Sequence, residues 1–208
     1  MSADAAIPYT VGIRPDTGLN NVKLGIWLFL SSEVMLFGSL FAGYILLRTG
    51  NPNWGAGTEL VNIPLAALNT VVLITSSVTM VMSWVAAMER NLGKLRLFMG
   101  ATVGLGAVFM VIKAIEYHEK LAHGAPPSYS TFIACYFTFT GLHALHVLAG
   151  MCVNFYFGFP GAKMMATDPQ QFANRVETAG LFWHFVDLVW IFLFPVLYLL
   201  NFNPPAGH

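Results

Sequence analysis

The sequence predicts an all-α membrane protein, a bundle of five transmembrane helices. The chain of 208 residues is 56% hydrophobic and only 10% charged, whereas an average soluble domain is about 25% charged. Its formal net charge is zero, with ten basic and ten acidic residues, so composition does not indicate a nucleic-acid partner. Five apolar stretches are long enough to cross a bilayer as helices, which takes roughly 20 residues each.

The expected organisation has three parts. Residues 1–21 should form a polar N-terminal arm, because they include charged residues and Pro and lack the apolar core of a signal peptide. Residues 22–201 should form the transmembrane domain, and residues 202–208 a short C-terminal tail. The helices are expected at about 23–48, 64–88, 96–120, 128–158 and 176–200. Pro and Gly in the connections mark the helix ends, and Asn62 is a candidate N-cap for the second helix.

Basic residues predict the orientation, because loops rich in Lys and Arg stay on the cytoplasmic side. One side of the membrane would carry Arg14, Lys23, Arg90, Lys94, Arg96, Lys163 and Arg175. The other side would carry only Arg48 and Lys120. We therefore expect the N-terminus in the cytoplasm and the C-terminus on the periplasmic side.

Stripes of small and weakly polar residues predict the packing faces, because lipid provides no hydrophobic drive for helix association. The candidate stripes are Gly25, Ser32 and Ser39 in the first helix, Asn62, Asn69, Ser76 and Ser83 in the second, and Gly100 and Gly104 in the third.

One carboxyl group, that of Glu33, lies within the apolar run WLFLSSEVMLFGSLFAGYILL of the first helix. No basic residue lies between Lys23 and Arg48 to pair with it. Its expected depth is on the order of 15 Å from the cytoplasmic end, where apolar surroundings favour the neutral acid. Glu33 is then either a protonated carboxyl that donates a hydrogen bond to a facing helix, or a proton-handling group.

The third helix ends in FMVIKAIEYHEK, in which Lys113, Glu116 and Lys120 follow one another at helical spacing. Residues three and four apart are neighbours on a helix face, so these side chains can form a ladder of ion pairs. Because they lie in the last turns, their long side chains can reach the membrane interface.

Two further polar pairs lie in the last two helices. His143 and His146 are three residues apart, and so are His184 and Asp187. Histidines can bind haem or a metal, and His143 with His184 could in principle ligate a haem between two helices. The favoured interpretation is hydrogen bonding between helices, with Asp187 orienting a histidine. We expect no catalytic, cofactor or metal site in this chain.

Four segments together resemble a known family. They are WLFLSSEVMLFGSLFAGYILLR, GAVFMVIKAIEYHEKLAHG, FTFTGLHALHVLAGM and ETAGLFWHFVDLVWIFLFPVLYL. In this order, and over roughly residues 21–200, they are similar to subunit III of haem–copper terminal oxidases, which comprise cytochrome c oxidases and quinol oxidases. The chain looks like the five-helix bacterial form, which lacks the first two helices of the seven-helix form.

The resemblance implies a function and partners. Subunit III is non-catalytic, and the haems and copper lie in subunits I and II, which reduce oxygen to water and pump protons. Subunit III packs on subunit I in the bacterial inner membrane, stabilises it and supports proton uptake. Structural phospholipids are expected, and a subunit IV or a larger respiratory supercomplex is a further partner that the family allows.

The resemblance also implies roles for residues. Glu33 matches the membrane carboxyl of the family that reacts with dicyclohexylcarbodiimide, a reaction that requires a protonated acid. The other signature positions are Glu116, His143, His146, His184 and Asp187. We expect Glu33 to hydrogen-bond His143 or His146 across the first and fourth helices.

Two alternatives stay open at this point. A subunit-III-like accessory protein of a nitric oxide reductase system shares this fold, and the neighbouring genes would distinguish it. A bis-His membrane cytochrome would show a Soret band in the purified chain. The sequence does not identify the electron donor, which is either cytochrome c or a quinol.

Overall fold

The computed structural model describes residue 13, residues 18–51, residue 54 and residues 57–200. The expected N-terminal arm and C-terminal tail lie almost entirely outside these residues. The described part contains five helices that are long and apolar enough to cross a membrane. They are α1 (Asn21–Gly50), α2 (Ile63–Met88), α3 (Leu92–Ala122), α4 (Thr131–Gly158) and α6 (Pro169–Phe194), which continues into the π-helix η3 (Pro195–Leu199). The all-helical fold expected from the sequence is confirmed.

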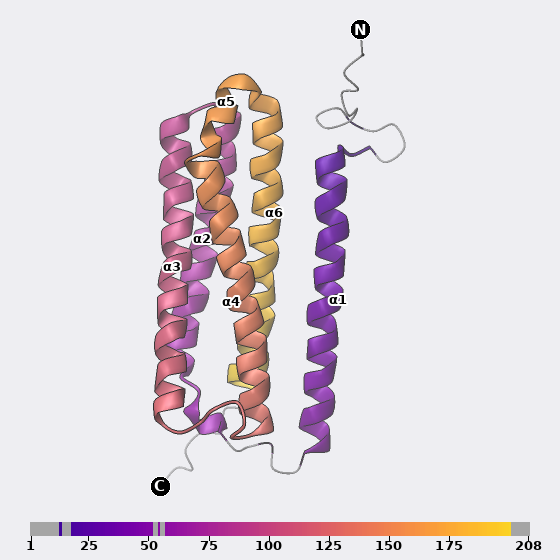
Figure 1. Ribbon diagram of the computed structural model, residues 1–208, viewed down its shortest axis with the longest axis vertical. Helices are drawn as coiled ribbons and strands as arrows, with labels where there is room; N and C mark the ends of the chain where they lie inside the picture. Colours follow the sequence, from indigo (N-terminus) through magenta and orange to yellow (C-terminus); the bar gives the residue numbers. More distant parts are fainter. Residues whose placement is uncertain (1–12, 14–17, 52–53, 55–56, 201–208) are drawn as a thin grey trace.

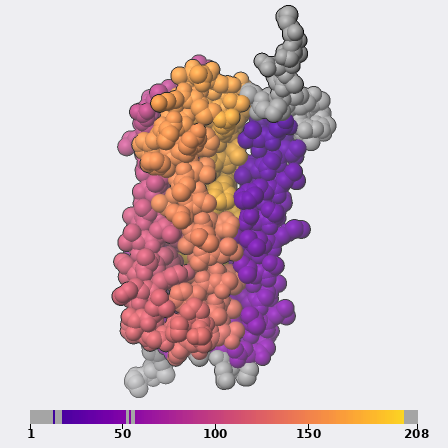
Figure 2. Space-filling view, viewed as in Figure 1, coloured from indigo at the N-terminus to yellow at the C-terminus, as the bar shows by residue number. Residues whose placement is uncertain are grey.

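Four of the long helices form one group, and α1 stands beside it. Helix α2 packs on α3 and α6, and α4 packs on the same two helices, so that α3 and α6 lie across the group from each other. Helix α1 contacts mainly α6, with a smaller contact to α4. Figure 1 shows α1 as a separate indigo column, and Figure 2 shows its side chains against the α4 side of the group. The short elements η1 (Thr58–Leu60), η2 (Gly161–Lys163) and α5 (Met164–Thr167) lie in the connections.

Each long helix begins at a polar side chain that accepts a hydrogen bond from the backbone three residues later. The caps are Asn20, Asn62, Asn91, Ser130 and Asp168. Such caps satisfy backbone donors that a helix cannot satisfy itself. Asp168 explains why α6 begins at Pro169 rather than near residue 176: the polar segment that follows is helical although it is not apolar.

Three of the four residues in the predicted polar stripe of α2 face the group interior, and the fourth, the cap residue Asn62, is exposed. Asn69, Ser76 and Ser83 have no exposed surface, and Trp183 of α6 donates its indole N–H to Ser76 Oγ over 3.0 Å. This part of the packing prediction is confirmed.

The small-residue stripes of α1 and α3 do not form the packing faces that were predicted. Gly25, Ser32 and Ser39 of α1 are exposed, and α1 instead packs through Leu30, Phe37 and Tyr44, which repeat at the same interval of seven. A repeat of seven defines a face of a helix but does not say which of several such faces meets a neighbour.

The close approach of α3 is at Gly106, which is buried, and not at Gly104, which has open space around it. A Cβ atom at Gly106 would lie 3.0 Å from Met151 Cγ and from Trp183 Cη2. On α4, a Cβ atom at Gly150 would lie 2.7 Å from Trp183 Cε3. Trp183 of α6 therefore occupies the space that the missing side chains of α3 and α4 leave.

Candidate functional site

Glu33 of α1 and His146 of α4 meet in the membrane-spanning part of the protein. Glu33 Oε2 lies 2.9 Å from His146 Nε2, and the two side chains are only 13% and 15% exposed. Phe37 contacts the His146 ring edge-on, with ring centroids 5.3 Å apart, and the ring centroid of Phe182 lies 6.4 Å from that of His146. Glu33 is about 18 Å along α1 from the helix start, at about 1.5 Å per residue. The pair thus lies between aromatic rings, deep in the span.

The second ring nitrogen of His146 determines the proton arrangement. His146 Nδ1 is 2.8 Å from the carbonyl oxygen of Leu142. A carbonyl only accepts, so Nδ1 carries a proton and donates it. If the imidazole is neutral, Nε2 is an acceptor and Glu33 must donate as the neutral acid. The alternative is an imidazolium with a carboxylate, and burial without further partners disfavours that charged form. The geometry therefore favours a protonated Glu33 that donates to His146.

His143 lies elsewhere, inside the four-helix group. It is fully buried, and its ring packs on Phe109 and Trp190 at centroid distances of 5.5 Å and 5.2 Å. Neither ring nitrogen forms a hydrogen bond to the described residues. The structure thus brings Glu33 to His146, one of the two expected partners, and turns His143 away from it.

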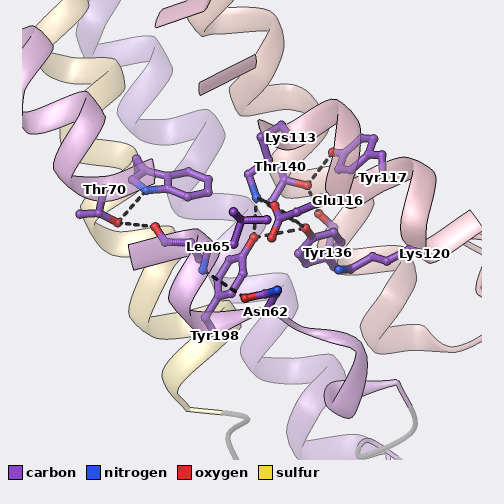
Figure 3. A network of polar contacts seen from close by, with 12 residues as sticks. Asn62, Leu65, Thr70, Lys113, Glu116, Tyr117, Lys120, Tyr136, Thr140 and Tyr198 are labelled. Atoms are coloured by element: carbon purple, nitrogen blue, oxygen red, sulfur yellow. Dashed lines mark hydrogen bonds and ion pairs between the residues drawn. The ribbon is translucent and has the colours of Figure 1, made fainter. Parts of the chain in front are cut away.

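Lys113 is the centre of a buried polar network (Figure 3). Its Nζ lies 2.5 Å from Glu116 Oε2 and 2.5 Å from Tyr198 Oη. Tyr136 Oη is 3.4 Å from Glu116 Oε2 and 3.2 Å from Tyr198 Oη. Lys113 Nζ also lies 4.7 Å from the ring centroid of Trp190, at cation–π distance. The network joins α3, α4 and η3.

Burial is the main difference from the expected ion-pair ladder. Lys113 and Glu116 are 3% and 1% exposed, so their side chains lie within the bundle and do not extend along its surface. Lys120 does not continue the ladder to Glu116: it donates to the carbonyl oxygen of Leu60 over 2.9 Å. Lys120 therefore ties η1 to α3.

Tyr136 and Tyr198 were not identified from the sequence. Tyr198 belongs to the π-helical turn that begins at Pro195, and such turns shift the helical register. Pro195 was the only sequence signal for this change, since proline disturbs the regular helical hydrogen bonds.

Ser77 of α2 links the two polar residues of α6. Its Oγ lies 3.0 Å from His184 Nδ1 and donates to Asp187 Oδ2. Asp187 is 5% exposed, whereas His184 is only half-buried. Asp187 thus reaches His184 through a hydroxyl group of a neighbouring helix. Ser77 was missed, although it directly follows a residue of the predicted α2 stripe.

These clusters do not assemble into a metal centre. Across the described part of the chain, no three His, Cys, Asp or Glu side chains gather as metal ligands would. The arrangement holds helices together through paired polar groups at membrane depth.

Two apolar grooves border α1. The first, of about 490 Å³, lies between α1, α4 and α6, and Arg175 is its basic lining residue. The second, of about 350 Å³, lies between α1 and α6 and includes Gly38, Phe41, Leu188 and Phe192. We call this second groove the α1–α6 groove.

The fold and these contacts define a multi-pass helical membrane protein in which polar side chains of different helices contact one another inside the bundle. Residues 10–202 match the family model described as cytochrome c oxidase subunit III. The chain belongs to this family, and the resemblance seen in the sequence is confirmed.

Named relatives cover nearly the whole chain. Cytochrome c oxidase subunit 3 of Corynebacterium diphtheriae is 38% identical over 203 residues, which is 95% of this chain and 96% of the relative. Cytochrome bo(3) ubiquinol oxidase subunit 3 of Pseudomonas aeruginosa is 34% identical over 89% of this chain and 88% of the relative. Cytochrome c oxidase subunit 3 of Bacillus sp. PS3 is 34% identical over 87% of this chain and 86% of the relative. This chain is thus a subunit III of haem–copper oxidases, a family that associates with other oxidase subunits.

Proposed function

We propose that this chain packs on the catalytic subunit I of its oxidase, in a complex with subunit II in a bacterial inner membrane. There it stabilises subunit I and supports proton uptake while oxygen is reduced to water and protons are pumped. The haems and copper belong to the partner subunits. The observation that carries this proposal is that buried ionisable groups of the span connect helices: Glu33 of α1 pairs with His146 of α4, and the Lys113–Glu116 pair of α3 contacts Tyr136 of α4 and Tyr198 of η3.

The proposed orientation has the N-terminus in the cytoplasm. Arg90, Lys94 and Arg96 lie at the turn between α2 and α3 and are exposed, which supports the charge rule applied to the sequence. Lys23 lies at the same end of the bundle, since its Nζ pairs with Glu177 of α6 over 2.8 Å.

We also propose that the groove between α1, α4 and α6 holds a structural phospholipid. Its lining is mostly apolar, as an acyl chain requires, and Arg175 can meet a phosphate group. Among the described residues, the guanidinium of Arg175 has only the sulfur of Met164 as a polar partner, at 3.3 Å.

The test compares the purified oxidase with and without this chain. We expect both preparations to start at similar rates of oxygen consumption, and the preparation without the chain to lose activity sooner during sustained turnover. Adding the purified chain back should restore the lifetime. Failure of the chain to copurify with subunits I and II, or equal lifetimes, would contradict the proposal.

A further inference from the structure

A polar pocket lies at the end of the bundle that carries α5 (Figure 1), apart from the clusters and grooves described above. Its volume is about 510 Å³, within the range of small-molecule sites, which is about 300–1,000 Å³. The start of α1, the end of α2 and the start of α6 contribute to its lining. The polar lining residues are Lys23, Trp84, Arg90, Gln170, Asn174 and Glu177. We call it the α2–α6 end pocket.

Two side chains of this pocket can only donate hydrogen bonds, and neither has an acceptor among the described residues. Trp84 Nε1 is a buried N–H group without a hydrogen-bond partner, and an indole nitrogen does not accept. Arg90 is exposed, and the acid of the pocket, Glu177, pairs with Lys23 over 2.8 Å and not with Arg90. Leaving a buried donor unpaired is unfavourable. The pocket therefore suits a ligand that brings acceptor oxygens.

The charge at this end of the bundle favours an anion. The six basic residues described here are Lys23, Arg90, Lys94, Arg96, Lys163 and Arg175, and the three acidic residues are Glu89, Asp168 and Glu177. Two of the acids are already paired with lysines, and the third caps α6. A surplus of positive charge around a hollow raises the local concentration of anions.

The position of the pocket indicates a ligand from water and not from the lipid phase. Helix α6 begins with PQQFANR, polar residues that precede its apolar stretch, and Gln170 and Asn174 of the pocket belong to this segment. The Lys23–Glu177 ion pair is part of the lining, whereas the neighbouring Val22 and Arg175 line the apolar groove between α1, α4 and α6. The lipid proposed above therefore occupies a different site.

The size of the pocket indicates a molecule larger than an inorganic ion. A hollow of about 510 Å³ has room for many water molecules, so a bare phosphate ion would leave most of it unfilled. The side-chain amides of Gln170 and Asn174 can both donate and accept hydrogen bonds, which suits the polar remainder of an organic ligand.

We propose that the α2–α6 end pocket binds a soluble phosphate monoester of up to mononucleotide size. Arg90 and the Trp84 indole N–H bind the phosphate oxygens, since a guanidinium forms strong charge-assisted hydrogen bonds to phosphate. Gln170 and Asn174 bind the remainder of the molecule. In the proposed orientation the ligand enters from the cytoplasm. The site goes beyond the proposed function and does not depend on how the chain packs on its partners.

The test is equilibrium dialysis of radiolabelled adenosine monophosphate against the oxidase preparation obtained through a tag on the full-length chain. We expect Arg90→Gln to weaken binding about tenfold or more, because it removes a charge-assisted contact. Trp84→Phe should weaken binding about three- to tenfold, because it removes the N–H group and keeps an aromatic ring. Glycerol 3-phosphate should compete for the site, and adenosine, which lacks the phosphate, should not.

Two matched controls separate the pocket from the general charge of the surface. Arg96→Gln removes an exposed cation at the same end that does not line the pocket. Trp27→Phe alters an indole that is 52% exposed on α1. Both variants should bind adenosine monophosphate as the wild type does. An equal loss in Arg90→Gln and Arg96→Gln would show attraction to the basic surface and overturn the site.

The remaining outcomes also overturn the proposal, each in its own way. Absence of displaceable binding of both adenosine monophosphate and glycerol 3-phosphate at millimolar concentrations would show that the pocket holds only water. Inorganic phosphate that binds as tightly as the esters would exclude an organic ligand. Displacement by dihexanoylphosphatidylglycerol but not by glycerol 3-phosphate would assign the pocket to a lipid headgroup.

Discussion

Glu33 shows how a membrane helix can carry a carboxyl group without a cation. In the arrangement that the geometry favours, the acid donates its own proton, and the acceptor is a histidine whose other nitrogen is engaged by a carbonyl group. The residue is thus a structural hydrogen-bond donor in a subunit proposed to support proton entry elsewhere in the enzyme.

The first prediction concerns replacement of this donor. Glu33→Gln should leave assembly and initial turnover largely unchanged, because an amide N–H can donate to His146 Nε2. Glu33→Leu should lower stability by about 1–3 kcal/mol, since it leaves a buried acceptor unpaired. The rate of thermal inactivation of the purified oxidase measures the stability of each variant. Carbodiimide labelling should disappear in both variants, and labelling retained in Glu33→Gln would show that the reactive acid is another residue.

The second prediction concerns the buried ion pair. Lys113→Met should destabilise the protein by about 3–5 kcal/mol, because it leaves the Glu116 carboxylate buried without its cation. The double variant with Glu116→Leu should recover much of this loss, since no lone charge remains. Unfolding in mixed detergent titrations would compare the two variants. A single variant as stable as the wild type would show that the pair is not charged.

At the scale of the helix, the sequence was sufficient for some features and insufficient for others. Length and hydropathy predicted the five spans, and the Asn62 cap was recognisable because capping depends on local sequence. The choice between His143 and His146 was not predictable, since it depends on how α4 is rotated against α1. Tyr198 was not predictable either, because the π-turn at Pro195 changes which side chains face Lys113.

The third prediction tests the contact between α4 and α6. Gly150→Ala places a Cβ atom 2.7 Å from a Trp183 ring carbon, so α4 must shift away from α6. The expected cost is about 1–3 kcal/mol, as for other overpacked sites. Gly104→Ala is the matched control, because nothing lies within 4 Å of its Cβ position, and it should be neutral or slightly stabilising. Equal stability of the two variants would contradict the tight packing at Gly150.

At the scale of the whole molecule, α1 is a peripheral helix held at its ends and its middle. Near its start Lys23 pairs with Glu177 over 2.8 Å, and Glu33 binds His146 further along. Towards its end Tyr44 Oη donates to the Val196 carbonyl over 3.2 Å, and Arg48 donates to that of Leu200 over 3.0 Å. Between these points α1 packs through the buried side chains of Leu30, Phe37 and Tyr44, with apolar grooves on either side. Polar contacts and apolar packing therefore together fix the position of α1.

The fourth prediction concerns the orientation of the molecule in the membrane. In a background with Cys152→Ala, Tyr129→Cys between α3 and α4 should react with an impermeant maleimide added to intact spheroplasts. Glu89→Cys, at the opposite end of the bundle, should react only after permeabilisation, because its loop carries the basic residues that stay in the cytoplasm. The reverse labelling pattern would overturn the proposed orientation.

The pairing of Glu33 has a consequence for biosynthesis. His146 follows Glu33 by 113 residues, which at about 5–20 residues per second take roughly 6–23 s to synthesise. During that interval α1 can enter the bilayer before its partner exists. A carboxylic acid can enter the bilayer as a neutral group and form its hydrogen bond later, when α4 is inserted. The free-energy barrier to inserting α1 is then lower than it would be with a permanently charged side chain. The order of insertion thus gives a reason, independent of the finished structure, for placing the proton on α1 and its acceptor on the later helix.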